Sequence, residues 1–580
     1  MELFKKTIAA KLSPLLDGIS EEEVLALLEY PPDNTMGDIS LPCFKLSKRL
    51  RKSPAAIADE LEAGIQGRDE KPGEIARTSS VSGYLNFYLD PAVIGDQVIS
   101  GILSSGDRYG SQNIGKGKTI VIDFSSPNIA KPFHVGHLRS TVIGNALYHI
   151  FSFLGYTCIG VNHLGDWGTQ FGKLITAYRM WGDPKRLEEG AIDELLSLYV
   201  RFHEEADKNP GLDDEARSWF TKIEQGNPEA LKIWREFVEL SLAEFEKIYD
   251  LLDIRFDHVT GESFYNDKLE PVIRELKQKE LLEEDGGAWL VRLEDYDMAP
   301  ALMLKQDGSS LYHTRDVAAA LYRKSAYQFH KAVYVTDYSQ SLHFRQWFKV
   351  VELMGYEWAE DLVHVPFGRV SLEGASLSTR KGNVVKLENL LHQAVSKIRD
   401  IIEQKNPGLK SKEEVARQVG VGAVIFNDLS ANRIKDIVFS WEDALSFEGE
   451  TGPYVQYTYA RACSVLRKAV GEAGRKTAAA PGQFLDFNSS LVTGEAEFAL
   501  VKQLSLFTER VEQAATKMEP SMVTRYLVDT AQAFNRFYHD CPILVEDSDL
   551  RTARLALVEG VRITLRNGLK LIGLQAPEEM

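Results

Sequence analysis

Two histidines in a loop of small residues are the first candidates for chemistry. His134 and His137 flank Val135 and Gly136, immediately before a run of apolar residues at helical spacing. At a helix N-terminus the free backbone N–H groups and the positive end of the helix dipole point the same way, so such a terminus binds anions. A lone histidine there is more often structural. Two histidines three residues apart, with a glycine that permits close approach, favour phosphate chemistry.

A second candidate is the cationic segment at residues 376–386, with the sequence SLSTRKGNVVK. Arg380 and Lys381 are adjacent in it, and small residues such as Ser378 lie close by. Cations of this kind stabilise the charge that develops on a departing triphosphate oxygen. The alternative is a solvated turn without a catalytic role.

Other polar residues are suited to a charged ligand. Tyr312 and Asp316 lie at an expected strand-to-helix junction, where a carboxylate beside a hydroxyl could bind a cationic side chain. A helix-capping aspartate is the alternative. Glu262 and Gln340 are isolated polar residues, and such residues are more often found on the surface than in a site.

The elements that must position the two histidines are a strand, a helix and a second strand. Lys118–Phe124 is a short β-branched run, typical of a buried parallel strand. Leu138–Leu154 has helical periodicity, and Gly155 follows it where a capping glycine is expected. Because Thr157–Val161 is a second apolar run, the unit is predicted to be a βαβ crossover in an α/β domain.

The rest of the chain divides into regions of different pattern. Residues 1 to about 110 are typical of an α+β module, with helices expected at Glu21–Leu28 and Leu46–Ile65 and a strand at Gly83–Leu89. Asp183–Leu252 is a charged, mostly helical block that interrupts the strand alternation, so we interpret it as an insertion. Further strands are expected at Gly287–Leu293, Ala301–Leu304, Ser310–His313, Lys331–Thr336 and Asp361–Gly368. The last third of the chain is almost wholly helical in pattern.

Composition restricts the class of protein. The 580 residues are 44% hydrophobic, enough for several domains. The chain has no apolar run of about 18 residues and no signal-peptide pattern, so no membrane span is expected. The four cysteines are far apart, which disfavours a zinc site and fits a reducing cytoplasm.

The net charge of −17 is unevenly distributed. Residues 181–300 contain 15 basic and 31 acidic side chains, whereas residues 455–580 contain 15 of each. Most of the acidic excess therefore lies in one middle block, and the ends of the chain can present basic faces to a polyanion.

Longer motifs around these candidates resemble those of the class I aminoacyl-tRNA synthetases, and most closely those of the arginyl-tRNA synthetase family. Residues 125–141, SSPNIAKPFHVGHLRST, look like that family's form of the HIGH signature with SPN upstream. Residues 162–172 (NHLGDWGTQFG) and 450–461 (ETGPYVQYTYAR) are also similar to family motifs. The resemblance covers essentially the whole chain.

The resemblance implies a Rossmann-like class I synthetase core with a helical insertion, an N-terminal α+β domain and an all-α anticodon-binding domain. The implied domains are a tRNA-elbow-binding domain (1–110), a catalytic domain (111–385, with the insertion at about 183–252), a helical stem-contact region (386–454) and the anticodon-binding domain (455–580). The implied reaction is the ATP-dependent ligation of L-arginine to tRNA(Arg) through arginyl-adenylate, with release of AMP and pyrophosphate. Mg²⁺ is expected as the counter-ion of ATP, and the protein is expected to be a monomer.

The resemblance also implies roles for single residues. The residues that would contact ATP are His134, Gly136, His137, Ser378 and Lys381. Those that would bind arginine are Ser126, Asn128 and His134 at the α-amino and carboxylate ends, and Glu262, Tyr312, Asp316 and Gln340 around the guanidinium. The chemistry agrees, because a guanidinium is a planar fork that carboxylates match bidentately.

One position departs from the family pattern. The second class signature is KMSKS, and Ser376 stands here in place of its first lysine. We expect Lys381 to meet the pyrophosphate, with Arg380 as the second choice. Lys131, just upstream of His134, could supply the missing charge from the other side.

Two other functions account for part of these features. A nucleotidylyltransferase shares the HxGH device on a helix but does not explain a guanidinium pocket or the helical last third of the chain. A non-catalytic RNA-binding paralogue would not require His134, His137 and Lys381, which are all present.

Overall fold

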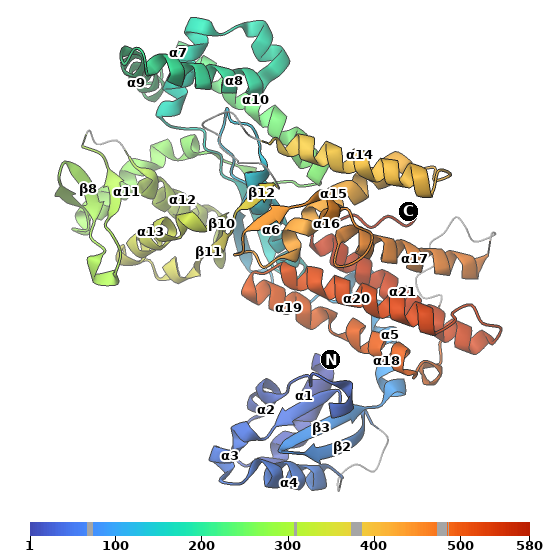
Figure 1. Ribbon diagram of the computed structural model, residues 1–580. Helices are drawn as coiled ribbons and strands as arrows, with labels where there is room; N and C mark the ends of the chain where they lie inside the picture. The colour runs from blue at the N-terminus through green and yellow to red at the C-terminus, as the bar shows by residue number, and fades with distance from the viewer. Residues whose placement is uncertain (67–72, 307–309, 373–384, 472–483, 485) are drawn as a thin grey trace.

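The computed structural model describes residues 1–66, 73–306, 310–372, 385–471, 484 and 486–580. An N-terminal module, an α/β domain with a helical projection and a C-terminal helical bundle follow one another along the chain (Figure 1). None of the helices in these ranges is long and apolar enough to cross a membrane.

The α/β domain is built on a five-stranded sheet with the strand order β11-β10-β4-β5-β6, in which all neighbours run parallel. Its strands are β4 (Thr119–Asp123), β5 (Thr157–Asn162), β6 (His258–Val259), β10 (Lys331–Asp337) and β11 (Leu362–Phe367). After β4 the chain adds β5 and β6 on one side, then returns to add β10 and β11 on the other. The carboxyl ends of β4 and β10 therefore form a topological switch point, where open α/β sheets bind ligands.

The βαβ unit expected around the two histidines is present. α6 (Val135–Phe153) joins β4 to β5, and Gly155 follows the helix with a φ of +84°. The helix packs closely on the sheet, because a Cβ added at Gly144 would lie 2.2 Å from the Phe124 side chain. This packing fixes the position of the N-terminus of α6 relative to the carboxyl ends of the strands.

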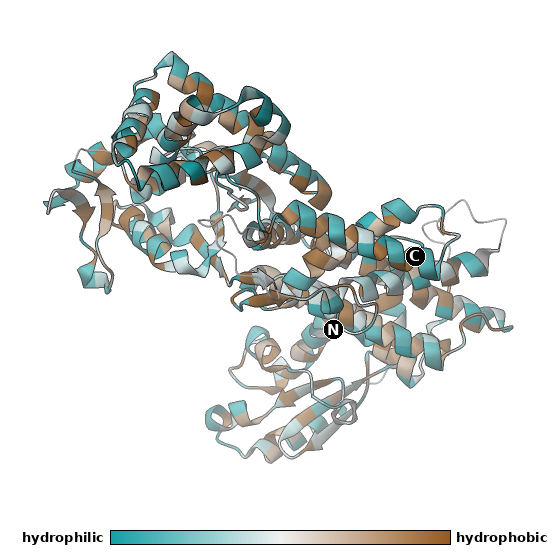
Figure 2. Ribbon diagram, turned by 45° about the horizontal axis from the view of Figure 1, so that its top comes forward, coloured by the Kyte–Doolittle hydropathy of each residue, from teal (hydrophilic) through white to brown (hydrophobic). Residues whose placement is uncertain are grey.

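A helical projection interrupts the α/β domain between β5 and β6 (Figure 1). It consists of α7 (Thr169–Trp181), α8 (Pro184–Ala206), α9 (Gly211–Glu224) and α10 (Pro228–Leu252). Teal and brown residues lie on different sides of these helices, as amphipathic helices require (Figure 2). The helical insertion expected near residues 183–252 is therefore present.

A second, antiparallel sheet lies in the segment between β6 and β10. It has the order β7 (Glu283–Asp285), β8 (Ala288–Val291), β9 (Ala301–Leu304), and it is accompanied by α11 (Leu269–Gln278), α12 (Tyr312–Tyr327) and, after β10, α13 (Ser341–Leu353). The prediction of a strand at Ser310–His313 is wrong. Ser310 forms one isolated bridge with Leu304, and α12 already begins at Tyr312, because the alanine-rich sequence after it continues the helix back to that residue.

The N-terminal module is a three-stranded antiparallel sheet covered by helices. It contains α1 (Glu2–Leu12), α2 (Glu21–Leu27), β1 (Ile39–Pro42), α3 (Phe44–Leu50), α4 (Pro54–Gln66), β2 (Ile75–Val81) and β3 (Tyr84–Leu89). The single helix predicted at Leu46–Ile65 is wrong, since α3 and α4 are separate. Arg51 has a φ of +54°, and Pro54, which lacks an N–H, starts the second helix. α5 (Pro91–Ser105) leads from this module to the sheet domain.

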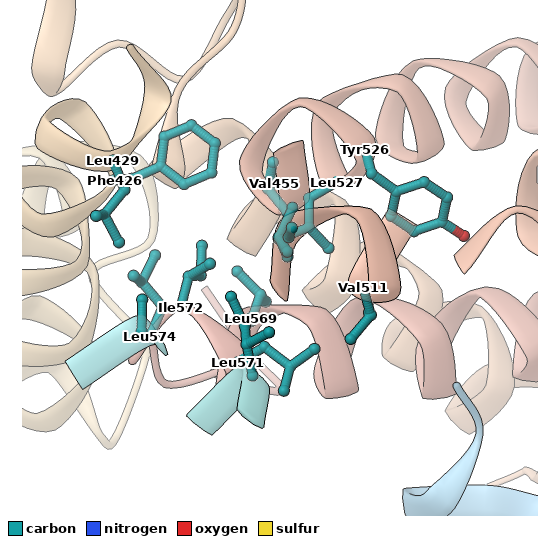
Figure 3. Close-up of a cluster of buried hydrophobic side chains, with 14 of the residues drawn as sticks. Phe426, Leu429, Val455, Val511, Tyr526, Leu527, Leu569, Leu571, Ile572 and Leu574 are labelled. Atoms are coloured by element: carbon teal, nitrogen blue, oxygen red, sulfur yellow. The ribbon is translucent and has the colours of Figure 1, made fainter. Parts of the chain in front are cut away.

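The last part of the chain is a helical bundle, as expected. Its main helices are α14 (Leu387–Lys405), α15 (Lys412–Ser430), α17 (Gly452–Val470), α18 (Glu495–Ser505), α19 (Phe507–Lys517), α20 (Ser521–Asp540) and α21 (Ser548–Leu571). Apolar side chains from α15, α17, α19, α20 and α21 meet in one core (Figure 3). β12 (Val370–Leu372) pairs with β13 (Ile437–Phe439), which joins this part of the chain to the sheet domain.

Candidate active site

The loop between β4 and α6 has an unusual backbone. Ser125, Ser126 and Ala130 have φ values of 71°, 50° and 60°, which residues with a Cβ rarely adopt. Hydrogen bonds hold this conformation, since the Ser140 hydroxyl accepts the Ser125 N–H at 2.9 Å and Asn162 Oδ1 accepts the Ser126 N–H at 3.1 Å. Strained backbone that is held in this way is concentrated at functional sites.

Tyr249 of α10 supports the same loop from the insertion. Its hydroxyl oxygen lies 2.8 Å from Ser125 Oγ and accepts a hydrogen bond from Asn162 Nδ2 at 3.0 Å. The helical projection therefore helps to shape the carboxyl edge of the sheet.

Asp123, the last residue of β4, links this loop to a buried arginine. Its carboxylate pairs with Arg323 of α12 at 2.7 Å and accepts the Ser126 hydroxyl at 2.8 Å. The Arg323 side chain is only 1% exposed. Burial lowers the pKa of His163, whose ring also lies in the field of Asp123 and Asp316. Residues of β4, β5 and α12 thus converge in one polar cluster beneath the loop.

Asn128 lies against the glycine-rich turn that follows β5. Its backbone bridges to Gly165, and a Cβ added at Gly165 would lie 2.2 Å from Asn128 Oδ1. Only glycine fits at position 165 without moving Asn128, so Gly165 permits the close approach of the asparagine side chain.

His134 and His137 lie at the start of α6, as expected. Nδ1 of His134 accepts the N–H of Gly136 at 3.0 Å, and Nδ1 of His137 accepts the N–H of His134 at 3.2 Å. The two ring centroids are 3.9 Å apart. A ring nitrogen that accepts a hydrogen bond carries no proton, so in the neutral rings both Nε2 atoms are donors.

The surroundings keep both imidazoles neutral. Burial lowers the pKa of His134 to about 4, and the neighbouring Lys131 adds to the effect. Burial also lowers the pKa of His137 well below its usual range, with further contributions from His134 and Lys131. Near neutral pH both histidines are therefore uncharged and carry their proton on Nε2, and burial also lowers the pKa of Lys131, which is half-buried beside them.

Glu262, Tyr312 and Asp316 come from distant parts of the chain and meet in one place. Glu262 begins the short helix η4 (Glu262–Lys268), and Tyr312 and Asp316 lie in the first turns of α12. Burial raises the pKa of Glu262 to about 8, and the nearby Asp316 adds to the rise. Partial desolvation also raises the pKa of Tyr312, which is nevertheless 67% exposed, and Glu262 and Asp316 contribute to the rise. The three groups therefore share one electrostatic environment.

Other polar side chains surround this carboxylate pair. Arg315 Nη1 donates to the Glu262 carbonyl oxygen at 3.3 Å and to Asn266 Oδ1 at 2.7 Å. Asp316 Oδ2 lies 2.5 Å from Nε2 of His343. A cleft of about 370 Å³ opens beside Glu262, and Trp167, Phe220, Tyr312 and Arg315 are among the residues that line it.

The remaining predicted site residues are less closely defined. Gln340 is exposed at the end of η6 (Tyr338–Gln340), three residues before His343, which contacts Asp316. Its described contacts do not join it to Glu262 or Tyr312. Ser378, Arg380 and Lys381 lie outside the described residues.

Several residues of this site were missed by sequence reasoning. Asp123, Arg323 and His343 reach the site through contacts that span tens to hundreds of residues along the chain. Arg323 lies in a helix, and its basic neighbour Lys324 makes the pair look like an exposed face. The sequence signal that could have indicated Asp123 as a site residue is its position as a polar residue directly at the end of a predicted strand.

Three family models match successive parts of the chain. Residues 98–441 match the catalytic domain of the class I tRNA synthetases (R), and residues 455–580 match the DALR anticodon binding domain. Residues 2–89 match the arginyl tRNA synthetase N terminal domain. The chain belongs to the arginyl-tRNA synthetase family. The predicted family and fold class are thus confirmed.

Individual relatives support the same family. The chain is 55% identical to the arginine–tRNA ligase of Alkaliphilus metalliredigens and 52% identical to that of Clostridioides difficile, and each match covers 100% of both chains. The arginyl-tRNA synthetase of Thermus thermophilus superposes with a TM-score of 0.81 at 27% identity, covering 100% of this chain and 99% of that one. The arginyl-tRNA synthetase of Plasmodium falciparum superposes with a TM-score of 0.79 at 26% identity, covering 99% of this chain and 98% of that one.

These findings establish the reaction. This synthetase uses ATP to ligate L-arginine to tRNA(Arg) through an arginyl-adenylate, and it releases AMP and pyrophosphate. The predicted enzyme class, arginine–tRNA ligase, is confirmed.

Proposed function

We propose that His134 and His137 carry the ATP half of the reaction. The observation that supports this most is that each Nδ1 accepts a backbone N–H, which leaves two Nε2–H donors at the start of α6. Gly136 between them lets the phosphates approach the backbone. Donors that are fixed before the reaction stabilise charge as it develops at the α-phosphorus, without reorganisation.

Arginine is proposed to bind between two parts of the carboxyl edge. Ser126, Asn128 and His134 would hold its α-amino and carboxylate groups, because they lie on the constrained loop beside the phosphate donors. The guanidinium would lie against Glu262, Tyr312 and Asp316, with Gln340 at the pocket edge. Two carboxylates suit a planar guanidinium fork better than the ammonium of lysine.

Cationic side chains are proposed to bind the pyrophosphate that leaves. Lys131 would act from the α6 side, with Lys381 first and Arg380 second on the other side, and Ser378 beside ATP. Mg²⁺ would arrive with ATP. In the part of the chain that the structure describes, no group of three or more histidine, cysteine, aspartate or glutamate side chains could hold a metal ion.

The outer regions are proposed to bind tRNA(Arg). The region of residues 1–110 would meet the tRNA elbow, residues 386–454 the stem, and residues 455–580 the anticodon, around a catalytic domain at residues 111–385. A monomer in the cytoplasm is the proposed working form, and light scattering on the purified enzyme with and without tRNA tests it.

The guanidinium site is tested by Asp316→Ala. Removing this carboxylate leaves the guanidinium without its bidentate partner, so arginine-dependent ATP–pyrophosphate exchange with tRNA present is expected to fall at least about a thousandfold. Thermal unfolding should stay close to that of the wild type. Exchange at the wild-type rate by a folded Asp316→Ala enzyme would contradict the assignment.

Citrulline provides a matched test of charge. It keeps the shape of arginine but lacks the positive charge, so the wild-type enzyme should not activate it. Activation of citrulline within tenfold of arginine would show that the carboxylates do not select the substrate.

A further inference from the structure

Arg139 is a buried arginine on the catalytic helix with no part in the proposed chemistry. It lies in α6 five residues after His134, and its side chain is 1% exposed. Its Nη1 donates to two backbone carbonyl oxygens, Gly368 O at 2.9 Å and Lys435 O at 2.6 Å. Its Nε lies 3.2 Å from Oδ1 of Asp428, which is 3% exposed.

The three partners of Arg139 lie in three different parts of the chain. Gly368 follows β11 at the carboxyl edge of the sheet and precedes β12, which leads to residues 373–384. Lys435 precedes β13, and Asp428 lies in α15. One guanidinium therefore joins the helix that presents the two imidazoles, the end of an edge strand, and the helical part of the chain.

The backbone around these partners is tightly packed. The N–H of Gly368 donates to the Arg433 carbonyl oxygen at 2.8 Å, and the N–H of Ile437 donates to the Arg369 carbonyl oxygen at 2.8 Å. A Cβ added at Gly368 would lie 2.5 Å from the backbone of Lys435. The backbone around Gly368 and Lys435 therefore cannot shift at one of these positions alone. Because Arg139 donates to both carbonyl oxygens, its position is coupled to that of both segments.

The same segment is fixed to the C-terminal bundle. Phe426 and Leu429, on either side of Asp428 in the sequence of α15, lie in the core that α15 shares with α17, α19, α20 and α21 (Figure 3). Arg433 Nε donates to the Met518 carbonyl oxygen at 3.1 Å, and Glu519 accepts the Arg433 N–H at 3.3 Å. Arg139 thus contacts a segment that is fixed to the bundle.

Stability alone does not explain a buried ion pair. Taking two charges out of water offsets most of their attraction, and well-packed apolar residues are often equally stabilising. What Arg139 adds is a single Nη1 that donates to carbonyl oxygens of two separate segments, and the rigid plane of the guanidinium fixes the position of that nitrogen. The two side chains are only 1% and 3% exposed, and this burial raises the pKa of Asp428 to about 6.

We infer that Arg139 is a positioning residue for adenylate formation: it sets the N-terminal turn of α6 relative to the carboxyl end of β11 and to α15. The inference rests on the proposed roles of His134 and His137. A misplacement of reacting groups by about 1 Å can reduce a rate about a hundredfold. The loss of Arg139 should therefore reduce kcat rather than weaken the binding of arginine.

The test replaces the whole pair, so that no charge remains buried. The variant Arg139→Met/Asp428→Val removes the carbonyl contacts and the ion pair together. The matched control is Arg562→Met/Glu559→Leu, which replaces a buried pair within α21. For each variant, kcat, the KM for ATP and the KM for arginine are measured by ATP–pyrophosphate exchange at saturating tRNA, together with thermal unfolding.

In the Arg139/Asp428 variant we expect kcat to fall about a hundredfold, with the arginine KM within twofold of the wild type. The control pair should keep the wild-type kcat. A folded Arg139/Asp428 variant with kcat within threefold of the wild type would overturn the inference. If this variant does not fold, Arg139→Lys replaces it, because the shorter lysine side chain keeps the charge opposite Asp428 but does not reach the position of Nη1 between the two carbonyl oxygens. A wild-type kcat in Arg139→Lys would likewise overturn the inference.

A parallel His134→Gln variant separates the two proposals. If adenylate formation is lost in His134→Gln but unchanged in the Arg139 variant, only the positioning role is wrong. If His134→Gln is fully active, the proposed function itself is wrong.

Discussion

At the scale of single residues, the hydrogen bonds of His134 and His137 make the Nε2 of each imidazole a hydrogen-bond donor. Each Nδ1 accepts a hydrogen bond from a backbone N–H, which fixes the tautomer and leaves the proton of the neutral ring on Nε2. Burial keeps the pKa values of His134 and His137 low, so their protonation state does not change over the working pH range. A pH dependence of the reaction above about pH 6 must come from other groups.

Glu262 is the group expected to supply such a pH dependence. Burial holds its pKa at about 8, so in the empty pocket it is mostly protonated at neutral pH. A guanidinium needs the carboxylate, so arginine binding should release a proton. The arginine KM should then fall nearly tenfold per unit as pH rises from about 6 towards 8. Titration calorimetry in buffers of different ionisation enthalpy measures the released proton directly.

The Glu262→Gln variant is the control for this prediction. It should bind arginine weakly, without the pH dependence. Because the folded-state pKa lies above the unfolded value, Glu262 stabilises the fold fully only below about pH 4.5, and this contribution is lost as pH rises through about 8. Glu262→Gln should therefore melt at a higher temperature than the wild type at alkaline pH. An arginine KM that does not change with pH in the wild type would contradict the account.

At the scale of elements, the start of α6 is held by close packing. A Cβ added at Gly136 would lie 2.7 Å from Cε1 of His134, so Gly136→Ala should push the ring out of line. We expect kcat of pyrophosphate exchange to fall about tenfold to a hundredfold, with little loss of stability. Gly101→Ala in α5 is the matched control, because nothing lies within 4 Å of its added Cβ. Equal activities of the two variants would argue against a positioned imidazole.

Prediction from sequence succeeded where the signal was local. The strand, helix and strand around His134 and His137 follow from the pattern of residues 118–163, and the helical insertion follows from the pattern of residues 183–252. The helix predicted at Leu46–Ile65 failed although Pro54 was the signal that could have divided it. Arg139 and Arg323 could not be foreseen, because their partners lie hundreds of positions away and a charged residue in a helical pattern indicates an exposed face.

At the scale of the whole molecule, the N-terminal module is fixed to the C-terminal bundle. Lys502 of α18 pairs with Asp38 at 2.7 Å, and the Tyr30 hydroxyl donates to Glu509 of α19. The Tyr109 hydroxyl, in the segment that connects the module to the sheet, donates to the Leu504 carbonyl oxygen at 2.9 Å. These contacts set the spacing between two regions that are proposed to bind tRNA.

Asp38→Asn tests this arrangement. The amide can still accept the Leu89 N–H that Asp38 accepts, but it no longer attracts Lys502. A looser module lowers the effective concentration of the second binding surface, so the KM for tRNA should rise about threefold to tenfold in aminoacylation. Pyrophosphate exchange at saturating tRNA should be unchanged. Glu60→Gln, which removes an exposed pair with Lys52 in the same module, should alter neither value. An unchanged tRNA KM in Asp38→Asn would show that the contact does not set the spacing.

The most direct test of the central claim is a rapid-quench measurement of arginyl-adenylate formation in a single turnover with arginine, ATP and tRNA. Replacing His134 or His137 by glutamine removes a fixed Nε2–H donor, and each loss should slow the chemical step about a hundredfold to a thousandfold. The dissociation constant of arginine should change little for His137→Gln. Wild-type rates of adenylate formation in both variants would contradict the account.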